Sequence, residues 1–335
     1  MFFIASWPRW KYVPGIGVRP VQTAKSTVML TLFNGANPMT RKTAQDFDQE
    51  LLILFDAYVH GSIDRRRFLE RAQKFATAGV TAGALLAALS PDFAAGQQIA
   101  KDDKRITTQM LTYPSSAGTG SVKGYLAKPA GAAGKLPAVL VIHENRGLNP
   151  HIEDIARRLA LDNYIAFAPD ALTPLGGYPG DEDKARELFG KLDQKKATED
   201  FVAATTFLRG RDDFSGKMGV VGFCYGGGMA HTLTTRLPEL NAAVPFYGNH
   251  PLAEDAARVK TPLLIHFAAM DERINSSWPA YEAALKAAGA SYTAHQYAGT
   301  QHGFNNDTTP RYDASAAKLA WDRTMAFFVS RLRTA

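Results

Sequence analysis

The sequence has a single cysteine in 335 residues. One cysteine excludes an intrachain disulfide, and with it a disulfide-stapled secreted fold. It also excludes zinc and iron–sulfur sites built from several thiolates. No uncharged segment is long enough to indicate a transmembrane span, and no internal repeat is visible. No basic stripe interleaved with aromatic residues indicates binding of nucleic acid. We therefore expect neither an integral membrane protein nor a nucleic-acid-binding protein.

What the chain does contain is ordinary globular composition, with 46% hydrophobic and 21% charged residues. That is enough for one large α/β domain and an extension. The net charge of +6 and a pI near 9.2 make the chain mildly basic. Much of the excess lies near the N-terminus.

From residue 122 onward, short apolar runs alternate with segments of helical periodicity. This alternation predicts an open, mostly parallel, doubly wound sheet with helices on both faces. Residues 97–121 are polar and predict a loop. The expected strands cover residues 122–128, 137–143, 164–168, 217–222, 242–247, 262–267 and 292–297. The expected helices cover residues 151–161, 183–189, 198–208, 229–237, 278–288 and 314–332.

The lone cysteine lies in the pattern Gly222-Phe-Cys224-Tyr-Gly226, between a predicted buried strand and a predicted helix. This is the G-x-C-x-G form of a nucleophile elbow. The glycines let neighbouring backbone pass closely, and the N-terminus of the helix favours a thiolate. The alternative is a glycine-rich turn around a buried structural cysteine, because free cysteine is often buried.

An elbow nucleophile needs an acid and then a histidine further along the chain. Asp271 and His302 each follow a predicted strand, in that order. Ligands of such sheets bind beyond the carboxyl ends of the strands, where all three residues are expected. Taken singly, His302 could be a histidine of a surface loop, and Asp271 could be a turn residue. Glu272 is the alternative to Asp271 as the acid of the triad.

The loop after strand 137–143 is expected to complete the site. An oxyanion hole combines the N–H that follows the nucleophile, on Tyr225, with one from this loop, for which we choose Asn145. Glu144 would then place a carboxylate close to the thiol. Its alternative is a solvated loop carboxylate.

Three regions are expected along the chain. Residues 1–38 are a leader that is disordered or not native, with Met39 as a possible start. Residues 39–100 are a helical extension or a twin-arginine export signal, because Arg65-Arg66 precedes a mild Ala/Gly-rich apolar run. Residues 101–335 are the catalytic domain. Export would place the protein in the periplasm, and a docked helical hairpin leaves it in the cytoplasm.

As a set, the motifs of roughly residues 105–333 resemble the dienelactone hydrolase family, α/β-hydrolases also called carboxymethylenebutenolidases. The resemblance implies an α/β-hydrolase fold with a Cys-His-Asp triad, and a glutamate, here Glu144, that takes the thiol proton when substrate binds. The motifs that carry it are His143-Glu144, Gly222-Phe-Cys-Tyr-Gly-Gly228, Pro245-Phe-Tyr-Gly248, the Asp271 loop and Gln301-His302-Gly-Phe304.

The chain departs from that family where well-studied members hold the substrate carboxylate with two arginines. Residues 172–179 contain no arginine, and Asn305-Asn306 follow the histidine. Possible replacements are Arg146, Arg273 and Arg311, and Tyr247 is a further candidate for substrate binding.

The sequence thus predicts a hydrolase of small-molecule esters or lactones that needs no metal and no organic cofactor. The alternatives are another cysteine-triad hydrolase, such as a thioesterase or peptidase, or a non-catalytic, redox-sensing protein on the same scaffold. The natural substrate and the oligomeric state stay open.

Overall fold

The computed structural model describes residues 41–77 and 79–333. The prediction made for residues 1–38 therefore lies outside the described residues. The described part of the chain forms an eight-stranded sheet in the order β1-β2-β4-β3-β5-β6-β7-β8. The strands are β1 (Ile106–Ser115), β2 (Gly120–Pro129), β3 (Leu136–Ile142), β4 (Ile165–Pro169), β5 (Phe214–Phe223), β6 (Ala242–Phe246), β7 (Leu263–Ala268) and β8 (Tyr292–Tyr297).

The sheet is mostly parallel, as predicted. Neighbours from β4 to β8 pair in parallel, whereas β2 runs antiparallel to both β1 and β4. Strands β3, β4 and β6 are buried along nearly their whole length. Strands covered on both faces read as continuous apolar runs, which is why the sequence pattern found them.

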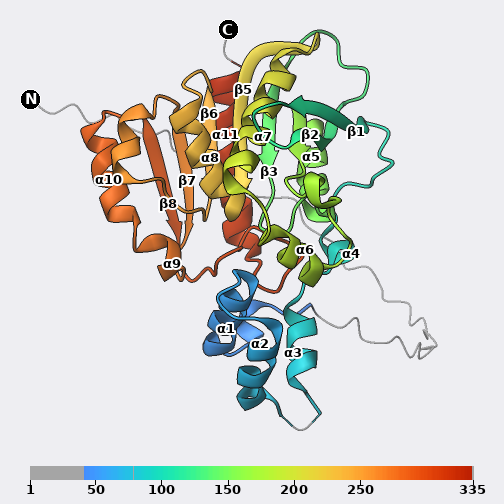
Figure 1. Cartoon of the computed structure of the whole chain (residues 1–335), viewed down its shortest axis with the longest axis vertical. Helices are drawn as coiled ribbons and strands as arrows, with labels where there is room; N and C mark the ends of the chain where they lie inside the picture. Colours follow the sequence, from blue (N-terminus) through green and yellow to red (C-terminus); the bar gives the residue numbers. More distant parts are fainter. Residues whose placement is uncertain (1–40, 78, 334–335) are drawn as a thin grey trace, which may run out of the picture. The chain divides into compact units, whose positions relative to one another are not determined.

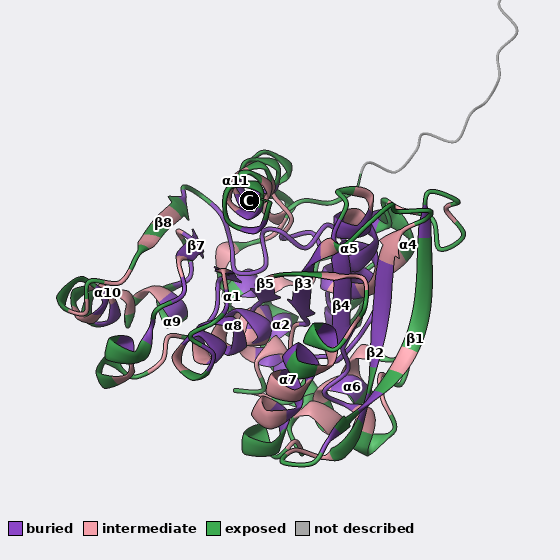
Figure 2. Ribbon diagram, turned by 90° about the horizontal axis from the view of Figure 1, so that it is seen from above, coloured by how far each residue is buried: buried purple, intermediate pink, exposed green. Residues whose placement is uncertain are grey.

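Helices cover both faces of the sheet (Figure 2). One face packs against α5 (Pro150–Leu161) and α11 (Ala314–Leu332). The other packs against α7 (Gln194–Arg209), α8 (Tyr225–Arg236) and α10 (Trp278–Ala287). The shorter helices near the site are α6 (Glu182–Phe189) and α9 (Glu272–Asn275).

The loop predicted for residues 97–121 is wrong in part, because β1 occupies Ile106–Ser115. This strand lies at the edge of the sheet and most of its residues are exposed. Its exposed positions carry threonine, glutamine, methionine and proline, so no buried apolar run marks it. An edge strand is held by backbone pairing, here with β2 along ten residue pairs, which composition does not reveal.

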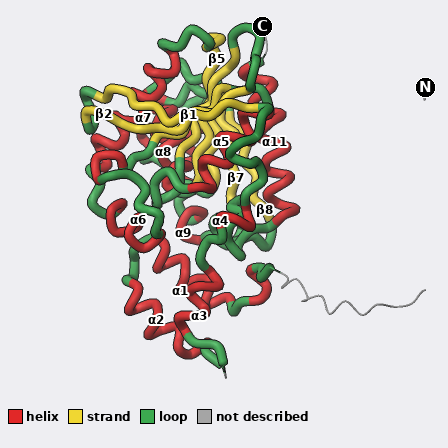
Figure 3. Tube along the Cα trace, turned by 90° about the vertical axis from the view of Figure 1, so that its right-hand side faces the viewer, coloured by secondary structure: helices red, strands yellow, loops and turns green. Residues whose placement is uncertain are grey.

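Before the sheet, the chain folds into a helical unit (residues 44–89), in which the described residues form no regular strand (Figures 1 and 3). It consists of α1 (Gln49–Val59), α2 (Arg65–Ala72), α3 (Ala82–Leu89) and short 3₁₀ turns. Apolar side chains of the three helices form a core of their own, with Phe68 and Leu89 fully buried. The Ala-rich run near residue 85 thus supplies one side of this core. Export by the twin-arginine route stays a prediction.

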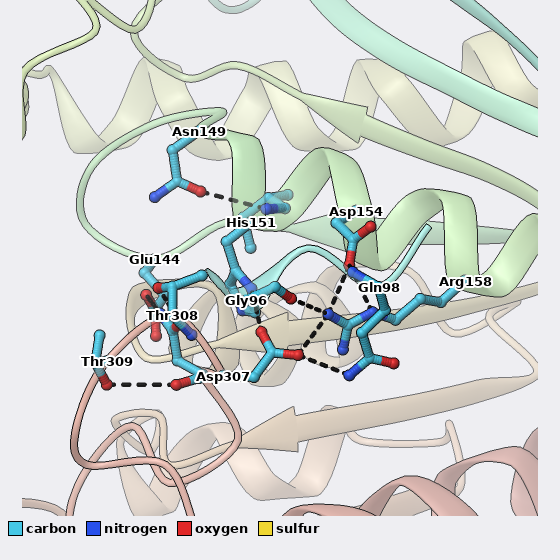
Figure 4. A network of polar contacts seen from close by, with 12 residues as sticks. Gly96, Gln98, Glu144, Asn149, His151, Asp154, Arg158, Asp307, Thr308 and Thr309 are labelled. Carbon is cyan, nitrogen blue, oxygen red and sulfur yellow. Dashed lines mark hydrogen bonds and ion pairs between the residues drawn. The ribbon is translucent and has the colours of Figure 1, made fainter. Parts of the chain in front are cut away.

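A short helix, α4 (Phe93–Gly96), and the segment after it join the helical unit to the sheet. Figure 4 shows the polar network at this junction. Arg158 on α5 donates to Asp154, Asp307 and the carbonyl oxygen of Gly96. Gln98 donates to Asp307 and, through its backbone N–H, to Asp154. The junction is therefore fixed both to α5 and to the loop that follows His302.

Among the described residues, no helix combines the length and apolar character needed to cross a bilayer.

Candidate active site

Cys224 occupies a sharp turn between β5 and α8. Its backbone has φ 54° and ψ −110°, and α8 begins at the next residue. A positive φ is uncommon for a residue other than glycine and stores strain, which the surrounding structure must hold in place. The residue is only 7% exposed. The turn has the geometry that the G-x-C-x-G pattern predicts.

The glycines around Cys224 are required by close backbone contacts. A Cβ on Gly222 would lie 1.9 Å from the carbonyl oxygen of Gly226. A Cβ on Gly226 would lie 2.2 Å from the carbonyl oxygen of Ile142. At the first position, the two sides of the turn are in backbone contact with each other. At the second, the start of α8 is in backbone contact with the end of β3. Side chains at these positions would push Cys224 away from the loop that follows β3.

The structure brings Asp271 and His302 together with the thiol. Asp271 follows β7 and His302 follows β8, and Nδ1 of His302 lies 2.5 Å from Oδ2 of Asp271. A ring nitrogen of His302 lies within 4.8 Å of the sulfur. Within the described part of the chain, Nε2 of His302 is buried without a hydrogen-bond partner. Because Asp271 holds Nδ1, Nε2 is the nitrogen available for proton exchange.

Charge around the sulfur favours the thiolate. Burial alone would raise the pKa of Cys224, but the charges of His302 and His60 outweigh it and lower the pKa to about 6. For His302, burial lowers the pKa, but the thiolate and Asp271 raise it to about 10. Thiolate and imidazolium therefore coexist between these two values.

Hydrogen bonds of the buried His143 hold the loop after β3 in place. This fully buried imidazole bonds at Nδ1 to the carbonyl oxygen of Glu144 and accepts at Nε2 from the N–H of Ala171. Burial lowers the pKa of His143, so it stays neutral. Glu144 accepts from Nδ2 of Asn306 at 2.8 Å. One of the two asparagines that follow His302 thus holds the predicted carboxylate.

The other predicted residues have more varied partners. Asn145 donates from its side chain to the carbonyl oxygen of Val59, which leaves its backbone N–H as the proposed oxyanion donor. The Tyr225 side chain stacks on His143. Tyr247 is buried, has φ 37° and packs its ring 4.9 Å from that of His302.

The arginines chosen from the sequence are engaged with protein atoms. Arg146 is buried and donates to the carbonyl oxygens of Val59 and Asn145. Arg273 reaches Nδ1 of His302 at 3.3 Å. Arg311 lies 3.1 Å from Asp56. Of these, Arg311 lines both pockets next to the site.

Sequence reasoning missed His60, at the C-terminal end of α1. Its Nε2 lies 3.3 Å from Sγ of Cys224. The signal that could have found it is Asp56, four residues earlier, because residues at this spacing share one face of a helix. Sequence alone does not show where that face docks.

His60, Cys224 and His302 have ligand atoms within 4.8 Å of one another, close enough to surround a metal ion. However, Arg273 contacts the imidazoles of both histidines. Its permanent positive charge opposes a cation and favours the thiolate.

A model of the "Dienelactone hydrolase family" matches residues 122–332, which is more than half of the chain. The chain belongs to this family. A second model, described as "YqhI-like", matches residues 39–77, within which α1 and α2 lie.

Curated relatives agree with this assignment. "Putative carboxymethylenebutenolidase" of Salmonella typhi is 32% identical over 244 residues, covering 68% of this chain and 88% of the relative. "Putative hydrolase fragment YghX" of Escherichia coli is 54% identical over 114 residues, covering 34% of this chain and 97% of the relative.

Among solved structures, the "Putative Dienelactone Hydrolase" of Klebsiella pneumoniae has a TM-score of 0.60 at 28% identity, covering 67% of this chain and 98% of that one. The predicted fold and family are confirmed, and the family makes the protein a carboxylic ester hydrolase. A small molecule is therefore its expected substrate.

Gly222→Ala tests the packing of the elbow. We expect it to lower the free energy of unfolding by about 1–3 kcal/mol or more, since the added methyl group meets backbone that cannot move freely. Gly210→Ala is the matched control, because its Cβ makes ordinary contacts and its effect should stay within about 1 kcal/mol. Equal urea midpoints for the two variants would contradict the packing argument.

The lone cysteine allows a direct test of the ion pair. Titration of the thiolate by ultraviolet absorbance should show a midpoint near pH 6 in the unmodified protein, the value to which the pKa of Cys224 is lowered. His302→Ala removes a positive charge and should move that midpoint upward by about 1–3 pH units. Cys224→Ser supplies the baseline. A wild-type midpoint near that of an ordinary thiol would refute the ion pair.

Proposed function

We propose that the protein hydrolyses esters or lactones through a Cys224–His302–Asp271 triad and an acyl-thioester intermediate. The observation that carries the proposal is the buried thiol on a strained elbow, next to an imidazole whose other nitrogen is held by a carboxylate at 2.5 Å. A nucleophile, its base and an orienting acid in this order form the working arrangement of covalent hydrolases.

In the proposed first half-reaction, the Cys224 thiolate attacks the substrate carbonyl carbon. The backbone N–H groups of Tyr225 and Asn145 stabilise the oxyanion that forms. When the tetrahedral intermediate collapses, the C–O bond breaks and the imidazolium of His302 gives its proton to the leaving oxygen. Asp271 keeps the ring oriented throughout.

In the second half-reaction, neutral His302 takes a proton from water, and the resulting hydroxide attacks the thioester carbonyl. The carbon–sulfur bond breaks and the thiolate returns to its starting state. Because a thiolate is a good leaving group, the tetrahedral intermediate of the first half-reaction can also expel the thiolate and return to the ester. This return competes with product formation. This favours activated or ring-strained esters over amides.

Two arginines beside the triad can hold an anionic substrate group, although carboxylates such as Glu144 and Asp56 line the same pockets. Arg273 and Arg311 lie beside the triad, and Arg311 lines both adjoining pockets. The substrate carboxylate is therefore proposed to meet Arg311 in place of the two arginines that well-studied family members use.

Mass spectrometry of the intact protein with p-nitrophenyl acetate tests the triad. We expect an acyl adduct that turns over, no adduct on Cys224→Ala, and a loss of acylation rate of about 10²- to 10⁴-fold in His302→Ala. His295→Ala is the control, because this half-exposed histidine lies within β8.

Full activity of Cys224→Ala would refute the nucleophile. A wild-type thiol that forms no adduct but is readily oxidised by peroxide would favour the redox-sensing alternative.

A further inference from the structure

The end of α1 places a second imidazole against the nucleophile. Nε2 of His60 lies 3.3 Å from Sγ of Cys224, in hydrogen-bond range for sulfur. The rings of His60 and His302 meet edge to face, with centroids 4.7 Å apart. The sulfur therefore faces two imidazoles, of which the triad uses one.

His60 is oriented as a catalytic imidazole would be. Its Nδ1 lies 2.9 Å from the carbonyl oxygen of Asp56 and 3.2 Å from that residue's carboxylate. These acceptors fix a proton on Nδ1 and turn Nε2 to the sulfur. Asp56–His60 thus repeats the pairing of Asp271 with His302.

The position of α1 is fixed by contacts with the site itself. The carbonyl oxygen of Val59, one residue before His60, accepts from the side chains of Asn145 at 2.9 Å and Arg146 at 3.2 Å. At the other end of α1, Gln301 donates to Gln49 at 2.7 Å. The helix is therefore tied both to the loop that follows β3 and to the loop that carries His302.

The charges that face His60 come from several elements. Cys224 and Asp56 favour its protonation, whereas His302 opposes it. Arg273 also opposes it, because its guanidinium donates to Nε2 at 3.0 Å, and this nitrogen can accept only while it carries no proton. Asp56 also contacts Arg311 at 3.1 Å and Arg273 at 3.6 Å, which offsets part of that opposition. Burial lowers the pKa of His60, but the thiolate and Asp56 outweigh it, so the pKa is raised.

We propose that His60 is a catalytic residue of the helical unit, one that holds Cys224 as a thiolate in the resting enzyme. The thiol S–H bond breaks and an N–H bond forms at Nε2 of His60, which then donates to the sulfur and no longer accepts from Arg273. This proton stays on His60, while His302 alone gives and takes the protons of acylation and deacylation. The inference rests on the proposed Cys224 nucleophile. It assigns to His60 the proton-accepting role that the family resemblance implies for Glu144, which here bonds to Asn306.

The test measures the thiolate without any substrate. In His60→Ala the midpoint of the thiolate titration should rise by about 1–3 pH units, because the sulfur loses one neighbouring positive charge. His60→Gln keeps a hydrogen-bond donor of similar size without the charge and should also raise the midpoint. Glu70→Gln, on an exposed part of α2, is the control and should leave it unchanged.

Acylation by p-nitrophenyl acetate supplies the second readout. The His60 variants should lose about 10-fold or more at pH 7 and recover at high pH, where the thiol ionises unaided. A structural role would lower the rate equally at every pH, and that result would overturn the inference. So would an unchanged midpoint, or acylation by His60→Ala that is faster at every pH, which would mean that His60 closes the site.

Failure of the inference and failure of the proposed function remain distinct. An unchanged thiolate midpoint in His60→Ala, with acylation that still needs Cys224, overturns only the inference. Esterase activity that survives in Cys224→Ala overturns the proposed function.

Discussion

The arrangement of the site depends on holding negative charge on one buried sulfur. Cys224 is 7% exposed, and burial by itself would keep its thiol protonated. The opposing interaction is the attraction between the thiolate and the imidazolium groups beside it, which strengthens where water is excluded. Three features keep this sulfur next to the imidazoles. They are the strained elbow, the carboxylates that bond to the imidazoles, and the closely packed glycines.

The sheet and the helical unit, which have separate hydrophobic cores, both place residues next to that sulfur. The sheet supplies the elbow, Asp271 and His302 from the ends of β5, β7 and β8. The helical unit supplies Asp56 and His60 from one helix end. Contacts from Asn145 and Arg146 to the carbonyl oxygen of Val59 link the two parts at the proposed oxyanion loop. A shift of α1 would therefore disturb both the charge on the sulfur and the proposed oxyanion donors.

The sequence predicted the position of those site residues that directly follow a recognisable strand. Cys224, Asp271 and His302 each come directly after a buried apolar strand, and parallel strands end at one edge of a sheet, so their proximity could be predicted. His60 could not, because it lies 164 residues before Cys224 and reaches it only through docking of a helix. Strand β1 was missed because its stability comes from backbone pairing at an exposed edge, which residue pattern does not record.

The docking of the helical unit also bears on the twin-arginine hypothesis. Arg65, the first of the two arginines, pairs with Asp183 of α6 at 2.6 Å, and it lies five residues after His60. A signal removed near residue 96 would take with it His60, Asp56 and the core formed by Phe68 and Leu89. The thiolate would then lose one of the two imidazoles that lower the pKa of Cys224. If the segment directs export, an enzyme that uses His60 must keep the segment attached after export. The proposed role of His60 in catalysis therefore requires that the segment is not cleaved.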